Sequence, residues 1–212
     1  MASSFNLSGT LNTLRLLHQP SLILPHLTIP TFAHLPIPLT IPPSPDQKPT
    51  TIRAIILDKD NCFAAPHSLS IHPSCQSTFS RLKATYPSAA LLIVSNTAGT
   101  SSDPASAQAL ALERETGVKV LRHGTKKPGC GPAVLAYLRA HPELRITSPD
   151  QIAVVGDRLL TDVMLANMMG AQSVWVRDGV TPKGFFARVE DGLAMWLLRR
   201  GYVAPEPRSE FE

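Results

Sequence analysis

Carboxylates stand directly after two short apolar segments of this sequence. Asp58 and Asp60 follow the segment IRAIIL, and Asp157 and Asp162 follow the segment IAVV. Taken singly, each acid has an ordinary explanation as a turn former, a helix N-cap or an acid of a first helical turn. Because a carboxylate beside a buried segment is costly without a compensating cation or donor, the four acids together indicate that a cation lies near them.

Hydroxyl, amide and basic side chains follow two other apolar segments. Ser95 and Asn96 come after ALLIV, and Lys126 and Lys127 lie in a basic loop after VKVL. Serine and asparagine are also common turn formers, and a pair of lysines is usually solvated surface. Combined with the four acids, however, a hydroxyl and a lysine provide a phosphate site that faces a hard-oxygen cation site. We therefore expect phosphoryl-transfer chemistry.

Five apolar segments, rich in branched residues, have the length of strands that are buried on both faces. They are residues 52–57, 90–94, 118–121, 152–155 and 173–176. Helix start and stop signals alternate with them: Pro73, Asp103 and Pro104 with Gly117, Pro132, and Thr161 with Gly170. A last amphipathic helix is marked by Phe185, Phe186, Val189, Leu193 and Trp196.

This alternation predicts an α/β fold, a Rossmann-like parallel sheet between helices. In such folds ligands bind beyond the carboxyl ends of the strands. The carboxylates, the hydroxyl and the lysines all follow strands, so we expect them to meet at one edge of the sheet.

Composition excludes several classes of protein. Hydrophobic residues make up 43% and charged residues 17%, which excludes a highly charged disordered chain. Cys62, Cys75 and Cys130 form no CxxC pair, so neither a disulfide framework nor a zinc site is expected. The net charge is +4, but no basic run exceeds two residues and aromatic residues are only 6%, which argues against nucleic acid as a partner.

Residues 1–50 differ in composition from residues 51–212, and we predict a domain boundary between them. No acid precedes Asp46, and residues 16–45 carry no formal charge. Repeated prolines exclude a membrane-spanning helix. A short amphipathic helix is predicted from leucines at helical spacing: Leu7, Leu11, Leu14 and Leu17.

Three interpretations of this apolar, Pro-rich leader remain. It is a segment that lies in a membrane interface, a mitochondrial targeting segment, or an arm that packs on the domain behind it. The long uncharged stretch favours the first two over plain packing.

Four motifs resemble those of the haloacid dehalogenase superfamily of phosphatases: DKDN at Asp58, SN at Ser95, KKPG at Lys126 and GDRLLTD at Gly156. The wider segments DKDNCF, SNTAGT, HGTKKPGC and GDRLLTDVMLANMMG, with PSLILPHL in the leader, resemble the mitochondrial phosphatidylglycerophosphate phosphatases of fungi and their bacterial relatives. Cys62 departs from the threonine of many superfamily members, which affects local packing more than chemistry.

The resemblance implies a role for each motif residue. Asp58 is the nucleophile that forms an aspartyl-phosphate, and Asp60 protonates the leaving group and then activates water. Ser95 and Lys127 stabilise the phosphoryl oxygens, with Lys126 beside them.

The resemblance also implies a Mg²⁺ site, made by the Asp58 carboxylate, the Asp60 backbone carbonyl and Asp157. Asp162 is expected near the cation, through water or by orienting Lys127. The candidates for binding the substrate are Asn96, Lys126 and Arg158.

The predicted helices and strand use most of residues 59–94 and 96–126, so we expect no cap domain and an open site. The resemblance implies dephosphorylation of phosphatidylglycerophosphate to phosphatidylglycerol in cardiolipin biosynthesis, by a peripheral enzyme on the matrix side of the mitochondrial inner membrane. Contact with an anionic membrane follows from this. The alternatives are a phosphatase for a soluble or nucleic-acid phosphomonoester and a catalytically inactive membrane-associated scaffold.

Overall fold

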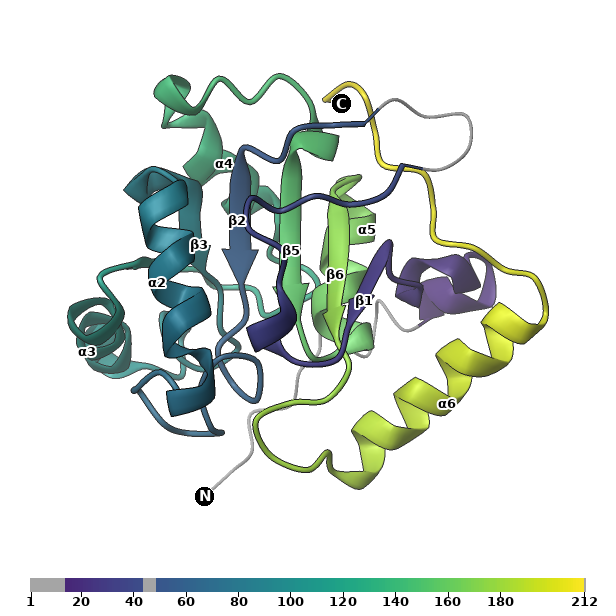
Figure 1. The fold of residues 1–212 in the computed structure, drawn as a ribbon, viewed down its shortest axis with the longest axis horizontal. Coiled ribbons are helices and arrows are strands. Elements are labelled where there is room, and N and C mark those ends of the chain that lie inside the picture. The colour runs from purple at the N-terminus through teal and green to yellow at the C-terminus, as the bar shows by residue number, and fades with distance from the viewer. Residues whose placement is uncertain (1–13, 44–48, 212) are drawn as a thin grey trace.

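The computed structural model describes residues 14–43 and 49–211. Their centre is a six-stranded parallel sheet of order β1-β6-β5-β2-β3-β4 (Figure 1). The strands are β1 (Leu27–Ile29), β2 (Ala54–Leu57), β3 (Leu91–Ile93), β4 (Lys119–Val120), β5 (Ile152–Gly156) and β6 (Gln172–Val176). The predicted α/β fold is confirmed, and each of the five predicted strands is present.

Helices cover both faces of this sheet. In Figure 1, α2 lies on the near side of the sheet and α4 and α5 on the far side, where α5 contacts β5, β6 and α4. The helices are α2 (Gln76–Thr85), α3 (Ala107–Thr116), α4 (Gly131–Arg139), α5 (Met164–Met169) and α6 (Phe185–Arg199).

Short helical turns join these elements. The 3₁₀ turns are η1 (Leu14–Leu17), η2 (Pro20–Ile23), η3 (Phe32–His34), η4 (Pro73–Cys75), η5 (Ser88–Ala90), η6 (Pro104–Ser106), η7 (Pro142–Leu144) and η8 (Pro149–Gln151). A single π-helical segment among the described residues, η9 (Leu159–Val163), leads directly into α5.

The predicted helix signals act as expected. The Asp103 carboxylate accepts hydrogen bonds from the backbone N–H of Gln108 and Ala109 at the start of α3, at 2.9 and 3.0 Å. Gly117 ends the same helix in a left-handed conformation, with φ of +68°, which glycine adopts without steric cost. Asp103 and Gly117 therefore fix the two ends of α3.

The predicted last helix is present as α6, and its apolar residues face away from the domain. The apolar residues that mark it in the sequence are exposed, and its buried residues are Ala187, Glu190, Ala194 and Leu197. Glu190 sets this orientation, because its carboxylate binds Arg158 and accepts a hydrogen bond from the backbone N–H of Leu159. The buried stripe of α6 is therefore narrow and contains a charge.

The leader supplies a sixth strand that the sequence analysis missed. In β1, Leu27 and Ile29 pair in parallel with Val174 and Val176 of β6. Beyond β1, residues 30–43 run across the near face of the sheet in Figure 1. The leader residues buried in the core are Leu22, Ile23, Leu24, Ile29, Phe32, Leu35, Leu39 and Ile41.

An aromatic cluster joins the leader to the rest of the core. The ring centroid of Phe32 lies 5.9 Å from that of Phe63 and 6.4 Å from that of Phe79 in α2. Residues 14–43 thus follow the packing interpretation, in contrast to a leader that stands apart from the domain. A targeting or membrane role stays a prediction, since most of the predicted amphipathic helix lies outside the described residues.

Among the residues that the structure describes, no helix combines the length and the apolar character needed to cross a membrane.

We expect Phe32→Ala to lower the free energy of unfolding by about 3–5 kcal/mol, because it leaves a cavity between Phe63 and Phe79. Urea unfolding followed by circular dichroism measures this change. The control is Leu17→Ala in the same leader, where the side chain is 79% exposed, with an expected change below about 0.5 kcal/mol. Equal stability of the two variants would contradict packing of the leader in the core.

Candidate active site

A buried lysine joins two carboxylates at the carboxyl edge of the sheet. The Lys127 ammonium, in the loop after β4, donates to the Asp58 carboxylate, which directly follows β2. It also donates to Asp162 Oδ1 at 2.6 Å, and Asp162 lies in η9. All three side chains are buried. The structure thus brings together three residues that lie far apart in the sequence.

Asp157 completes a group of three carboxylates. One oxygen each from Asp58, Asp157 and Asp162 lies within 4.8 Å of the others. Gly156 makes this approach possible, because a Cβ atom there would lie 2.3 Å from the Asp162 carboxyl carbon. An all-oxygen set of buried carboxylates fits Mg²⁺ in donor type. The Asp60 carboxylate is outside this group. The predicted cation ligand from Asp60 is its backbone carbonyl.

The pKa values of these groups are shifted by burial and by the charges around them. Burial raises the pKa of Asp58 well above its usual range, although Lys127 opposes this shift. Burial, with the charge of Asp162, raises the pKa of Asp157 to about 7. For Lys127, burial lowers the pKa, but the two carboxylates outweigh it and the net shift is upward. One ammonium thus pairs with two of the three carboxylates, and a divalent cation would balance the remaining charge.

Asp60 is held beside this group by Lys59, a residue that the sequence analysis did not single out. The Lys59 ammonium is buried and lies 2.5 Å from Asp60 Oδ1 and 2.9 Å from the carbonyl oxygen of Ser68. The backbone N–H of His67 also donates to Asp60 Oδ1. The Asp60 side chain is 32% exposed and lines the cavity described below, so these bonds orient it toward solvent that enters the site.

Asn61 connects Asp157 to the loop after β6. Its Nδ2 donates to Asp157 Oδ2 at 3.2 Å, and its Oδ1 accepts from both the backbone N–H and the hydroxyl of Thr181 at 2.8 Å. From the sequence, Asn61 is either a residue that orients the substrate or a loop residue that forms local hydrogen bonds. These contacts make it a positioning residue for Asp157.

In the loop after β3, Asn96 and Ser95 are placed differently. Asn96 lines the cavity, and its Oδ1 accepts from the backbone N–H of Lys127 at 2.8 Å. The Ser95 hydroxyl is buried, lies 3.0 Å from the Thr97 hydroxyl and accepts from the backbone N–H of Thr97 and Ala98. In this conformation the Ser95 hydroxyl oxygen holds its own loop, and either hydroxyl of the Ser95–Thr97 pair can be the donor.

The two remaining basic candidates also differ. Arg158 lines the cavity and forms a two-pronged ion pair with Glu190 of α6, which raises the pKa of Arg158. Lys126 is half-buried, but its neighbour Lys127 is the one that lines the cavity. Of the two lysines, Lys127 is therefore the one placed to neutralise a bound phosphoryl group.

These side chains surround a cavity of about 320 Å³. Its floor contains the three carboxylates and Lys127, and its wall includes Thr181 to Gly184 and Ala187, where α6 begins. A carboxylate bound to a lysine, a second carboxyl group, a buried ammonium and a donor set for a hard cation thus share one space. This combination can bind a phosphoryl group and transfer it to a carboxylate.

Comparison with known proteins gives the same family for most of the chain. A family model described as mitochondrial PGP phosphatase matches residues 7–181. Phosphatidylglycerophosphatase GEP4, mitochondrial, of Saccharomyces cerevisiae is 51% identical over 175 residues, which cover 82% of this chain and 89% of the relative. The probable phosphatidylglycerophosphatase, mitochondrial, of Schizosaccharomyces pombe is 32% identical over 197 residues, or 92% of each chain.

A relative from an alga has a longer chain. Phosphatidylglycerophosphate phosphatase 1, chloroplastic, of Chlamydomonas reinhardtii is 35% identical over 162 residues, covering 76% of this chain and 55% of the relative. The family match begins within the leader, in agreement with the packing of β1 against β6. The extent of the family match and the identity to the two yeast proteins show that this chain belongs to the mitochondrial PGP phosphatase family.

Proposed function

We propose that this protein is a Mg²⁺-dependent phosphatase that converts phosphatidylglycerophosphate to phosphatidylglycerol and orthophosphate. The observation that carries the proposal is the Asp58 carboxylate, bound to Lys127 at the floor of a cavity and grouped with Asp157 and Asp162. The substrate follows from the names of the fungal relatives. Their names also support a mitochondrial location, and we place the reaction in cardiolipin biosynthesis on the matrix side of the inner membrane.

In the first step, Asp58 attacks phosphorus in line with the ester oxygen. A P–O bond to Asp58 forms while the bond to the glycerol oxygen breaks, and Asp60 gives a proton to that oxygen. Lys127 holds Asp58 in place and neutralises charge on the phosphoryl oxygens. Phosphatidylglycerol leaves with its glycerol oxygen protonated to a hydroxyl group, and Asp58 carries the phosphoryl group.

In the second step, water attacks the aspartyl-phosphate. Asp60, now a carboxylate, takes a proton from the water as its oxygen bonds to phosphorus. The bond between phosphorus and Asp58 breaks, which frees orthophosphate and restores both carboxyl groups. Asp60 must hold a proton when substrate binds, and Lys59 keeps its side chain in position for both transfers.

Asp58, Asp157 and the backbone carbonyl of Asp60 would hold Mg²⁺, and Asp162 would orient Lys127. When bound, the ion supplies electrostatic stabilisation of the phosphoryl charge and of the crowded carboxylates.

We expect Asp58→Asn to lower phosphate release from phosphatidylglycerophosphate by about 10³-fold or more, because an amide cannot act as the nucleophile. The assay measures orthophosphate from lipid in detergent micelles, with Glu115→Gln on the exposed side of α3 as a charge-matched control. Glycerol 3-phosphate and a phosphorylated oligonucleotide serve as competing substrates. Full activity of Asp58→Asn would exclude the mechanism, and faster turnover of either competing substrate would exclude the lipid assignment.

Metal binding should depend on pH through Asp157. Because its pKa in the metal-free protein is raised to about 7, the protonated form of Asp157 contributes stability at low pH that is lost as the pH rises through 7. Mg²⁺ needs the deprotonated form, so the increase in melting temperature caused by Mg²⁺ should be larger at a pH of about 8 than at about 6. Calorimetry with and without chelator measures both effects.

The matched variant for this measurement is Asp157→Asn, which removes the titrating group and one proposed ligand. We expect it to reduce the pH dependence of the Mg²⁺ effect and to weaken the effect itself, while Glu115→Gln behaves as wild type. A Mg²⁺ effect of the same size in wild type and Asp157→Asn would remove Asp157 from the metal site.

A further inference from the structure

Helix α6 carries large apolar side chains on the face that points away from the domain. Phe185, Val189 and Trp196 are 73%, 54% and 49% exposed. Their spacing of four and seven residues places them on one side of the helix, opposite the buried stripe formed by Ala187, Glu190, Ala194 and Leu197. Further exposed apolar residues of the helix are Phe186, Leu193, Met195 and Leu198.

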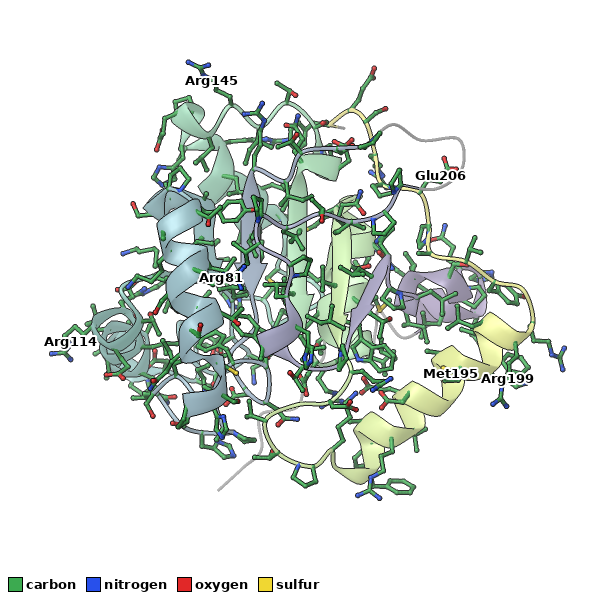
Figure 2. The ribbon with its side chains drawn as sticks, in the orientation of Figure 1. Arg81, Arg114, Arg145, Met195, Arg199 and Glu206 are labelled. Carbon is green, nitrogen blue, oxygen red and sulfur yellow. The ribbon has the colours of Figure 1, made fainter. Side chains whose placement is uncertain are left out.

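The charges of this helix are arranged asymmetrically. Its two acids are paired: Glu190 with Arg158, and Asp191 with Lys183, which lies at the start of the helix. The outward basic residues are Arg188, Arg199 and Arg200, and all are exposed. Figure 2 shows Arg199 extending away from the sheet. The outer face is therefore apolar and positively charged, a combination typical of helices that lie in an anionic membrane interface.

The charge pattern favours an anionic bilayer over a second copy of the chain. If two copies met through α6, each would bring its arginines toward those of the other, and like charges at an interface are unfavourable. In a bilayer interface the apolar side chains enter the acyl region while the arginines contact lipid phosphates. The Arg200 guanidinium, 4.7 Å from the ring centroid of Trp196, is already held beside an inserting side chain.

This helix also begins at the mouth of the active-site cavity. Lys183, Gly184 and Ala187 line that cavity, and the ion pair between Glu190 and Arg158 ties the helix to the loop after β5. In Figure 1, α6 runs from the carboxyl edge of the sheet along the side of the molecule. A bilayer that contacts α6 would therefore lie next to the opening through which a phosphorylated headgroup must enter.

We infer that α6 is the surface by which this protein docks on an anionic membrane, with Phe185, Val189 and Trp196 inserted and its arginines bound to lipid phosphates. The part of this inference that concerns entry of the lipid substrate rests on the proposed function. It assigns membrane contact to α6 instead of to the leader, whose residues 14–43 pack on the domain.

The test combines vesicle flotation with two activity assays, using the full chain and a Val189→Ser/Trp196→Ser variant. The vesicles contain equal amounts of phosphatidylcholine and phosphatidylglycerol, with phosphatidylcholine alone for comparison. The control is Leu110→Ser, at a side chain that is 48% exposed. Its helix, α3, lies on the opposite side of the molecule from α6 in Figure 1. Melting temperature verifies that all three proteins are folded.

We expect wild type and Leu110→Ser to float with the anionic vesicles and the double variant to bind them at least about tenfold more weakly. Hydrolysis of phosphatidylglycerophosphate in vesicles should fall with binding, while hydrolysis of the soluble substrate p-nitrophenyl phosphate stays at the wild-type rate. Arg199→Gln should weaken binding by roughly fivefold, and added salt should weaken wild-type binding.

Equal flotation of wild type and the double variant would overturn the inference while leaving the proposed function in place. A wild-type dimer that the double variant converts to monomer, without vesicle binding, would also overturn it and would make this face an interface between copies. Flotation that depends on α6, with hydrolysis of neither substrate, would instead support docking and contradict the proposed function.

Discussion

The shared lysine is the interaction on which the arrangement of the active site depends. An ammonium group taken out of water is costly by several kcal/mol unless its partners stay at bonding distance, and Lys127 finds those partners in Asp58 and Asp162. The loop after β4, the end of β2 and the segment η9 must therefore meet. A parallel sheet allows this, because it brings the carboxyl ends of strands from distant parts of the sequence to one edge.

The same arrangement leaves an excess of negative charge that no residue of the group removes. Asn61 donates to Asp157 but carries no charge, and Lys127 is already divided between two carboxylates. Burial is the main cause that raises the pKa values of Asp58 and Asp157, and the neighbouring carboxylates add to it. A carboxylate with a raised pKa binds a cation in competition with a proton.

The sequence predicts those parts of the fold that depend on local pattern. Segments of four to six residues, rich in branched side chains, mark five of the six strands, and the chemistry-bearing residues lie in the loops that follow four of them. Strand β1 could not be found in this way, because a three-residue segment between prolines becomes a strand only through its pairing with β6. The role of Lys59 could not be predicted for a related reason. In the sequence Lys59 is one more charged residue in a loop, and its role depends on its burial beside Asp60.

Helix α6 shows how one buried charge controls the orientation of a whole element. Periodicity identifies the helix and its apolar residues, but the side that faces the domain is set by Glu190, which binds Arg158 and the backbone N–H of Leu159. Turning that carboxylate outward would break these bonds and leave Arg158 without its partner, whereas turning Phe185 and Trp196 outward loses only apolar burial, about 25 cal/mol per Å². The observed orientation keeps the ion pair and leaves the apolar face exposed. That loss is recovered when the face enters an apolar medium, so the contact that holds Arg158 at the cavity also prepares α6 for binding at an interface.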